Sequence, residues 1–145
     1  MLDHAEFGRW LEASDDEASV ARTLADAGAH NAVVLHSEQA SQLILKGLLR
    51  GVGNAADAWG HALSELAERA AAATGLELDD GLREQLAVLQ RDYMPTRYPD
   101  AVTSGTPRGN YTPQDADRAL STFADLRHAV MAAWGQLTAH REGGA

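Results

Sequence analysis

The chain has 145 residues, of which 45% are hydrophobic and 23% charged, and its 21 acidic and 12 basic residues give a formal net charge of −9. This composition is typical of one globular domain and not of a disordered chain. The acidic balance disfavours general duplex DNA or RNA binding, which needs a cationic face, and the absence of cysteine excludes disulfides, thiol catalysis and cysteine-ligated zinc.

Apolar residues recur at steps of three and four, and no stretch alternates with the period of two that a strand requires. The first stripe, from Phe7 to Ala25, predicts a helix that ends at Gly28. Ser14–Glu17 permits two interpretations: a capping box that begins a new helix, or an acidic turn within one continuous helix, which we favour. A second helix is expected from about His30 to Arg50.

Two shorter helices and one long helix complete the predicted elements. The third helix should run from about His61 to Thr74, and the fourth should start near Asp79–Asp80, where either residue can cap it. Residues 95–110 hold three of the four prolines and predict a loop. Thr112 then has the features of an N-cap, followed by a proline at the first helical position and an acid in the capping-box position.

These elements predict an all-α protein, an antiparallel up-and-down bundle of four to five helices. We expect one domain over residues 1–141 and a frayed tail over 142–145. No apolar run approaches the roughly 20 residues of a membrane span, and no signal peptide is visible. A cytoplasmic protein with no membrane segment is therefore expected.

One polar stripe on the second helix is a candidate binding surface, and it includes the only lysine of the chain. Its members, spaced at three and four residues, are His36, Gln39, Leu43, Lys46 and Arg50. The stripe is either a solvated face opposite the core or a pocket for an anion or nucleotide. In a pocket, Lys46 and Arg50 would hold phosphate while His36 and Gln39 would donate or accept hydrogen bonds.

A second candidate lies in the loop, where Arg97, Tyr98, Pro99 and Asp100 follow one another. Arginine can form a bidentate pair with phosphate, and tyrosine can stack on a base. The alternative is that Tyr98 anchors the loop on the bundle while Arg97 pairs with Asp100 or another nearby acid.

Metal and cofactor motifs are not found in the sequence. It has no HExxH motif, and the only acid–histidine pair of suitable spacing is Asp125 with His128. No glycine-rich phosphate loop follows a strand. We expect no metal or cofactor, although a three-histidine site assembled in space would make the chain a metal-dependent bundle enzyme.

Four segments in order carry a resemblance to a known family. They read HSEQASQLILKGLL over 36–49, GHAL over 60–63, RYPD over 97–100 and YTPQDA over 111–116. In this order and spacing the chain resembles the HEPN domain family (higher eukaryote and prokaryote nucleotide-binding). The resemblance implies a bundle of four main helices that forms homodimers, and binding of a nucleotide or RNA. It also implies contact with a minimal nucleotidyltransferase in a toxin–antitoxin-like pair.

The family's motif residues fall on Gln39 with Ala40, on Lys46, on His61, and on Arg97 with Tyr98. The chain departs from the family pattern at Gln42, usually a glutamate, and at Leu43, often a lysine. We assign no catalytic residue; the ligand-binding candidates are His36, Gln39, Lys46, His61, Arg97, Tyr98 and Asp100.

Many family members are metal-independent RNases that use an arginine, a spacer of about four to six residues and a histidine. Here Arg22 and His30 are too far apart and Arg127 and His128 are too close. The absence of this motif favours a non-catalytic binding protein. The alternative is a metal-independent endoribonuclease toxin with a rearranged pair, such as Arg97 with His36 or His61.

Overall fold

The computed structural model describes residues 1–144, which form α-helices and short 3-10 helices with no strand. The α-helices are α1 (His4–Asp26), α2 (His30–Gly51), α3 (Leu63–Thr74), α4 (Asp80–Arg91) and α5 (Pro113–Gly143). The 3-10 helices are η1 (Ala55–Asp57), η2 (Pro99–Ala101) and η3 (Arg108–Asn110). The predicted all-α bundle is confirmed.

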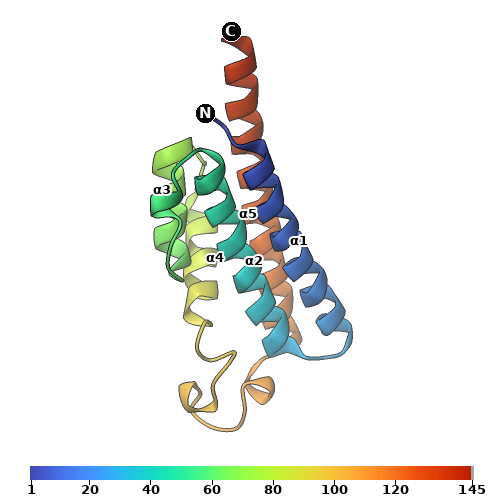
Figure 1. The fold of residues 1–145 in the computed structure, drawn as a ribbon. Coiled ribbons are helices and arrows are strands. Elements are labelled where there is room, and N and C mark those ends of the chain that lie inside the picture. The colour runs from blue at the N-terminus through green and yellow to red at the C-terminus, as the bar shows by residue number, and fades with distance from the viewer. Residues whose placement is uncertain (145) are drawn as a thin grey trace.

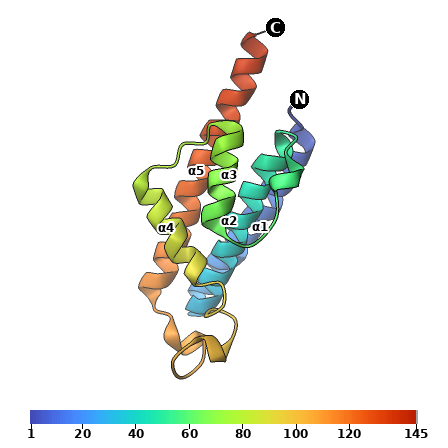
Figure 2. The same ribbon diagram turned by 90° about the vertical axis from the view of Figure 1, so that its left-hand side faces the viewer.

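The long helices α1, α2 and α5 pack side by side, and α3 and α4 cover the other side of α2 and α5 (Figures 1 and 2). α1 and α2 run in opposite directions, as do α3 and α4. The connection over 52–62 returns along the bundle, so that α3 points in the same direction as α2 (Figures 1 and 2). The end of α5 projects beyond the bundle, near the N-terminus of the chain. None of the helices in the described part of the chain combines the length and hydropathy needed to cross a membrane.

α1 is continuous through the segment that permitted two interpretations. Ser14 is buried, and its hydroxyl donates to the carbonyl of Ala40 in α2 at 2.8 Å instead of capping a new helix. The prediction of one helix is therefore correct, and the capping-box alternative is wrong. Gly28 takes a positive φ of 73° in the turn before α2, as expected for a helix stop.

α2 is the central helix of the core, and two glycines allow its neighbours to approach closely. A Cβ added at Gly47 would lie 2.5 Å from the Cβ of Trp10, and one at Gly51 would meet Phe7 and Trp134. The ring of Phe7 stacks on Trp134 with centroids 4.1 Å apart. These contacts join α1, α2 and α5 at one end of the bundle.

The predicted caps are present. The side chain of Asp79 accepts from the Leu82 amide at 2.7 Å, and Thr112 with Asp115 forms a reciprocal capping box. The start of the third helix differs from the prediction, because α3 begins at Leu63 and leaves His61 in the preceding loop. α5 is helical to Gly143; of the tail over 142–145, Ala145 lies outside the described residues.

Candidate functional site

The polar stripe of α2 divides into two parts that face different neighbours. His36 and Arg50 face α1: the Nδ1 atom of His36 lies 2.5 Å from a carboxylate oxygen of Glu17, and Arg50 stacks over the Trp10 ring at 4.8 Å. Gln39 and Lys46 belong to the other part: the side-chain amide of Gln39 donates to Glu38 at 3.1 Å, and the charge of Glu38 acts on Lys46. His36, predicted as a ligand-binding candidate, is therefore engaged in the contact between α1 and α2.

A buried carboxylate organises the other part of the stripe. Glu38 is 1% exposed, and it accepts hydrogen bonds from the side-chain amides of Gln39, at 3.1 Å, and Gln42. A guanidinium nitrogen of Arg97 lies 3.5 Å from the same carboxylate. The loop before the last helix is thereby connected to the middle of α2.

Burial raises the pKa of Glu38, while the hydrogen bonds from Gln42 and Gln39 and the positive charge of Arg97 act in the opposite direction. A buried carboxylate without such partners would be strongly unfavourable. Glu38 therefore requires Arg97 beside it, and it holds that guanidinium in place.

His61 joins the same network through Gln42. Because the amide nitrogen of Gln42 donates to Glu38, its amide oxygen faces the Nδ1 atom of His61, at 3.1 Å. Nδ1 then carries the proton and the Nε2 atom of this exposed side chain is available to a ligand. His61 and Arg97 both pack against the ring of Tyr93, at 4.9 Å between ring centroids and at 4.1 Å from the guanidinium carbon to the centroid.

Lys46 completes what we call the α2 polar site, which comprises Glu38, Gln42, Lys46, His61 and Arg97. Lys46 is half-buried and makes no hydrogen bond or ion pair with residues 1–144. Burial lowers its pKa, and the positive charges of Arg50 and Arg69 lower it further, while Glu38 raises it. The ammonium group therefore has no acid within ion-pair distance among the described residues, and the charge of Glu38 acts on it only from farther away.

The remaining two candidates lie outside this network. Tyr98 is 49% exposed and Asp100 is exposed in η2. The alternative was that Tyr98 anchors the loop and Arg97 pairs with Asp100 or another nearby acid. Arg97 does pair with an acid, Glu38, at 3.5 Å, as that alternative allowed.

Two members of the network were not among the predicted site residues. Glu38 lies within the motif on the second helix, one turn before Gln42, and this spacing of an acid and an amide was the available signal. For Tyr93, nothing in the sequence indicated a site role other than its position four residues before Arg97. Gln42 appeared only as a departure from the family pattern, yet its amide bridges Glu38 and His61.

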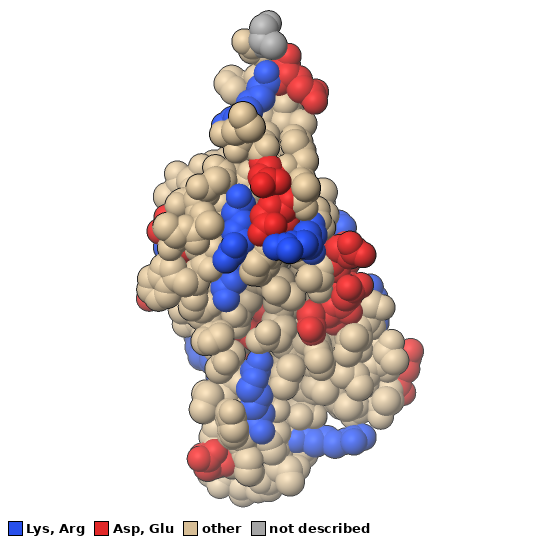
Figure 3. Space-filling view, viewed as in Figure 1, with Lys and Arg blue, Asp and Glu red and all other residues tan. Residues whose placement is uncertain are grey.

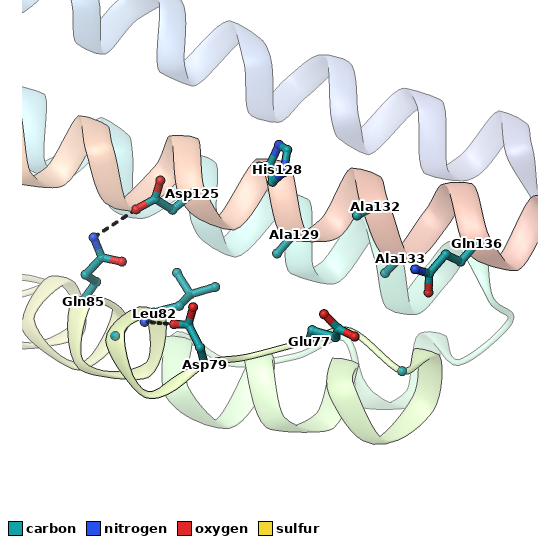
Figure 4. Close-up of a pocket in the computed structure, with 12 residues that line it drawn as sticks. Glu77, Asp79, Leu82, Gln85, Asp125, His128, Ala129, Ala132, Ala133 and Gln136 are labelled. Atoms are coloured by element: carbon teal, nitrogen blue, oxygen red, sulfur yellow. Dashed lines mark hydrogen bonds between the residues drawn. The ribbon is translucent and has the colours of Figure 1, made fainter.

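A groove on another side of the bundle does not suit phosphate. It has a volume of about 800 Å³ and separates α5 from the connection between α3 and α4 (Figure 4). Glu77 and Asp79 face α5 across it, and Asp125 accepts a hydrogen bond from Gln85 at 3.2 Å. No lysine or arginine lines the groove. His128 is present, but within residues 1–144 no group of three or more acids or histidines is placed to hold a metal ion.

The surface charge agrees with a local site and not with a broad basic face. On the side that presents α1 and α2, basic and acidic side chains form small separate groups, and wide uncharged areas lie between these groups (Figure 3). Arg50, Arg69 and Arg97 each lie within 4 Å of an acid, at 3.7, 3.7 and 3.5 Å.

Comparison with known proteins identifies the family. A model of the HEPN domain matches residues 7–133. A crystal structure of TT1696 from Thermus thermophilus has a TM-score of 0.80 and 29% identity, covering 88% of this chain and 98% of that one. The structure of ST0689, an archaeal HEPN homologue, has a TM-score of 0.70 at 24% identity, covering 90% and 97%, and supports the fold. No match was found among curated proteins. The chain belongs to the HEPN domain family.

Proposed function

We propose that this protein is a non-catalytic binding module that holds the phosphate groups of a nucleotide or RNA at the α2 polar site. The observation that supports this function is the unpaired, half-buried ammonium of Lys46 beside Arg50 and Arg69. Arg50 and Arg69 each lie 3.7 Å from an acid, whereas Lys46 has no acid within ion-pair distance among the described residues.

A bound phosphate would supply the missing counter-charge. It would favour the charged form of Lys46 and offset the repulsion from Arg50 and Arg69. Hydrogen bonds between charged partners are stronger than neutral ones. The exposed His61, whose Nδ1 atom is held by Gln42, can present its Nε2 atom to the same ligand.

Titration calorimetry with inorganic tripolyphosphate tests this proposal. Lys46→Met removes the charge and keeps the length of the side chain, and we expect at least about a tenfold loss of affinity, the effect of one charged hydrogen bond. Arg108→Met, an exposed change in η3, is the control and should leave the affinity unchanged. Equal affinity of the Lys46→Met variant and the native protein would contradict the proposal.

A second candidate function is a metal-independent endoribonuclease, and one observation favours it. His61 and Arg97, one of the rearranged pairs expected from the sequence, pack against the same Tyr93 ring. The pairing of Arg97 with Glu38 weighs against it, since that guanidinium is already neutralised. Incubation with total RNA in the presence of EDTA separates the two functions. Cleavage that His61→Ala and Arg97→Ala both abolish would establish the RNase, and its absence supports the binding module.

We also propose that the protein acts in the cytoplasm as a homodimer, as a partner of a minimal nucleotidyltransferase in a toxin–antitoxin-like pair. The projecting end of α5 leaves helical surface uncovered that a second copy could bury (Figures 1 and 2). Sedimentation at micromolar concentration should show a dimer, and a monomer would contradict this. Copurification with a nucleotidyltransferase encoded in the adjacent reading frame tests the partner.

A further inference from the structure

An exposed tryptophan, Trp59, lies two residues before His61 of the α2 polar site. Trp59 is 60% exposed, whereas Trp134 is 8% exposed in the core. The guanidinium carbon of Arg69, in α3, lies 4.6 Å from the centroid of the Trp59 ring. The indole therefore has a cation packed against it and still presents most of its surface to solvent.

The loop that carries Trp59 is held on both sides. Arg69 donates to the carbonyl of Asp57 at 3.1 Å and to the carbonyl of Trp59 itself at 2.8 Å. Two residues after the tryptophan, His61 is bound to Gln42 of α2. These contacts fix the backbone on either side of the indole without using the indole, so the exposed ring is not needed to hold the loop.

The fixed loop also connects the indole to the proposed phosphate site, because His61, two residues after Trp59, is bound to Gln42, one helical turn before Lys46. Arg69, which packs on Trp59, is close enough to Lys46 for its charge to lower the pKa of that lysine. An anion at Lys46 would thus lie near an aromatic surface that is already ordered, and binding to an ordered surface loses less conformational entropy.

We infer that Trp59 is a stacking platform for a nucleobase, so that the ligand is a nucleotide or a single-stranded RNA and not a simple inorganic phosphate. The base would stack on the indole, and its phosphates would lie against Lys46. This inference rests on the proposed function, because Lys46 supplies the phosphate contact.

Stacking on an aromatic side chain is tolerant of base identity and strengthens binding by roughly five- to 100-fold for each base. The guanidinium of Arg69 adds a cation–π contribution from its own side of the ring. ATP should therefore bind more tightly than tripolyphosphate, and the difference should depend on Trp59.

The experiment compares ATP with tripolyphosphate on five proteins: the native chain, Trp59→Ala, Trp59→Phe, Tyr98→Ala and Met94→Ala. Met94 is an exposed apolar residue outside the site and serves as the control. Trp59→Ala should lose roughly five- to 100-fold in ATP affinity and none in tripolyphosphate affinity, while Trp59→Phe should retain part of the ATP preference. Binding of ATP should also quench the fluorescence of Trp59, and this quenching should be absent in Trp59→Phe. Circular dichroism checks that each variant is folded.

The outcomes separate this inference from the proposed function. If tripolyphosphate binds through Lys46 but ATP binds no more tightly, the phosphate site stands and the platform is wrong. If ATP is preferred but Tyr98→Ala removes the preference in place of Trp59→Ala, the platform is also wrong, because the base then lies at the other exposed aromatic residue. If neither compound binds, both proposals fail.

Discussion

The surroundings of Lys46 lower its pKa, so its charge should change with pH differently from that of an ordinary lysine. Burial disfavours the ammonium form first, the charges of Arg50 and Arg69 disfavour it further, and Glu38 opposes them. The pKa of Lys46 therefore lies below the ordinary value of 10.5, and the free protein loses this charge at a lower pH than a typical lysine would. A bound anion reverses the shift, so binding near that pKa takes up a proton.

The affinity for tripolyphosphate should fall as the pH is raised toward 10.5, the ordinary pKa of lysine, because the pKa of Lys46 lies below that value and the ammonium loses its proton earlier. Lys46→Arg should flatten the profile, since arginine stays charged throughout. Calorimetry across one buffer series measures both proteins. The protonation of tripolyphosphate itself also changes with pH, but it affects both proteins equally and cancels in the comparison. If the affinity of the native protein depends on pH no more than that of the Lys46→Arg variant, Lys46 does not bind phosphate as proposed.

Between elements, the contact of α1 with α2 depends on the absence of a side chain at Gly47. An alanine there would bring its Cβ to 2.5 Å from the Cβ of Trp10, and overpacking of this kind costs about 1–3 kcal/mol. The gain in helix propensity, about 1 kcal/mol, offsets only part of this cost. The free energy of unfolding of Gly47→Ala, measured in urea, should therefore decrease.

Gly135→Ala is the matched control, because Gly135 also lies within a helix but a Cβ there would meet nothing within 4 Å. It should increase the free energy of unfolding by roughly 0.5–1 kcal/mol. If both alanine variants are equally stabilised, the close approach of α1 and α2 at Trp10 is wrong.

The same distinction between local and long-range contacts explains what the sequence could predict of the fold. The caps at Asp79 and Thr112 bond residues three positions away, so a short motif contains both partners. Ser14 looked equally like a cap because its partner, the Ala40 carbonyl, belongs to another helix. His61 was placed inside a helix for a similar reason, since its bond to Gln42 holds it in the loop.

The candidate site depends even more on contacts between residues far apart in the sequence, which a short motif does not contain. Lys46 was identified from the spacing along the second helix, Arg97 from the loop sequence, and His61 only from the family resemblance. His61 contacts Gln42 and Arg97 contacts Glu38, so both lie beside α2, the helix that carries Lys46. Glu38 was missed because an acid on a helix is usually solvated, and only the folded chain brings Arg97 to it. Trp59 was missed because a single aromatic residue in a loop has no periodicity, and its partner Arg69 lies on the following helix.

At the scale of the whole molecule, a net charge of −9 restricts how RNA can bind. Acidic groups line the groove beside α5 and would repel phosphate there (Figure 4), while side chains of both signs are spread over the face in Figure 3. Attraction is left to the few cations near the α2 polar site, of which Lys46, Arg50 and Arg69 lie together. Each phosphate neutralised on a single strand contributes about −0.7 to the slope of log K against log salt concentration.

If Arg50 and Arg69 exchange their acids, each 3.7 Å away, for phosphate, three contacts predict a slope of about −2 for a short labelled oligouridylate, measured by fluorescence anisotropy between about 50 and about 200 mM salt. Lys46→Met should make the slope shallower by about 0.7, because one contact is lost, while Arg108→Met should leave it unchanged. A slope steeper than about −4 would require more cations than this site contains. The RNA would then have to bind across a broader surface. The face in Figure 3 argues against that mode, because its basic side chains form small separate groups, beside acids in the upper half and among uncharged residues in the lower half.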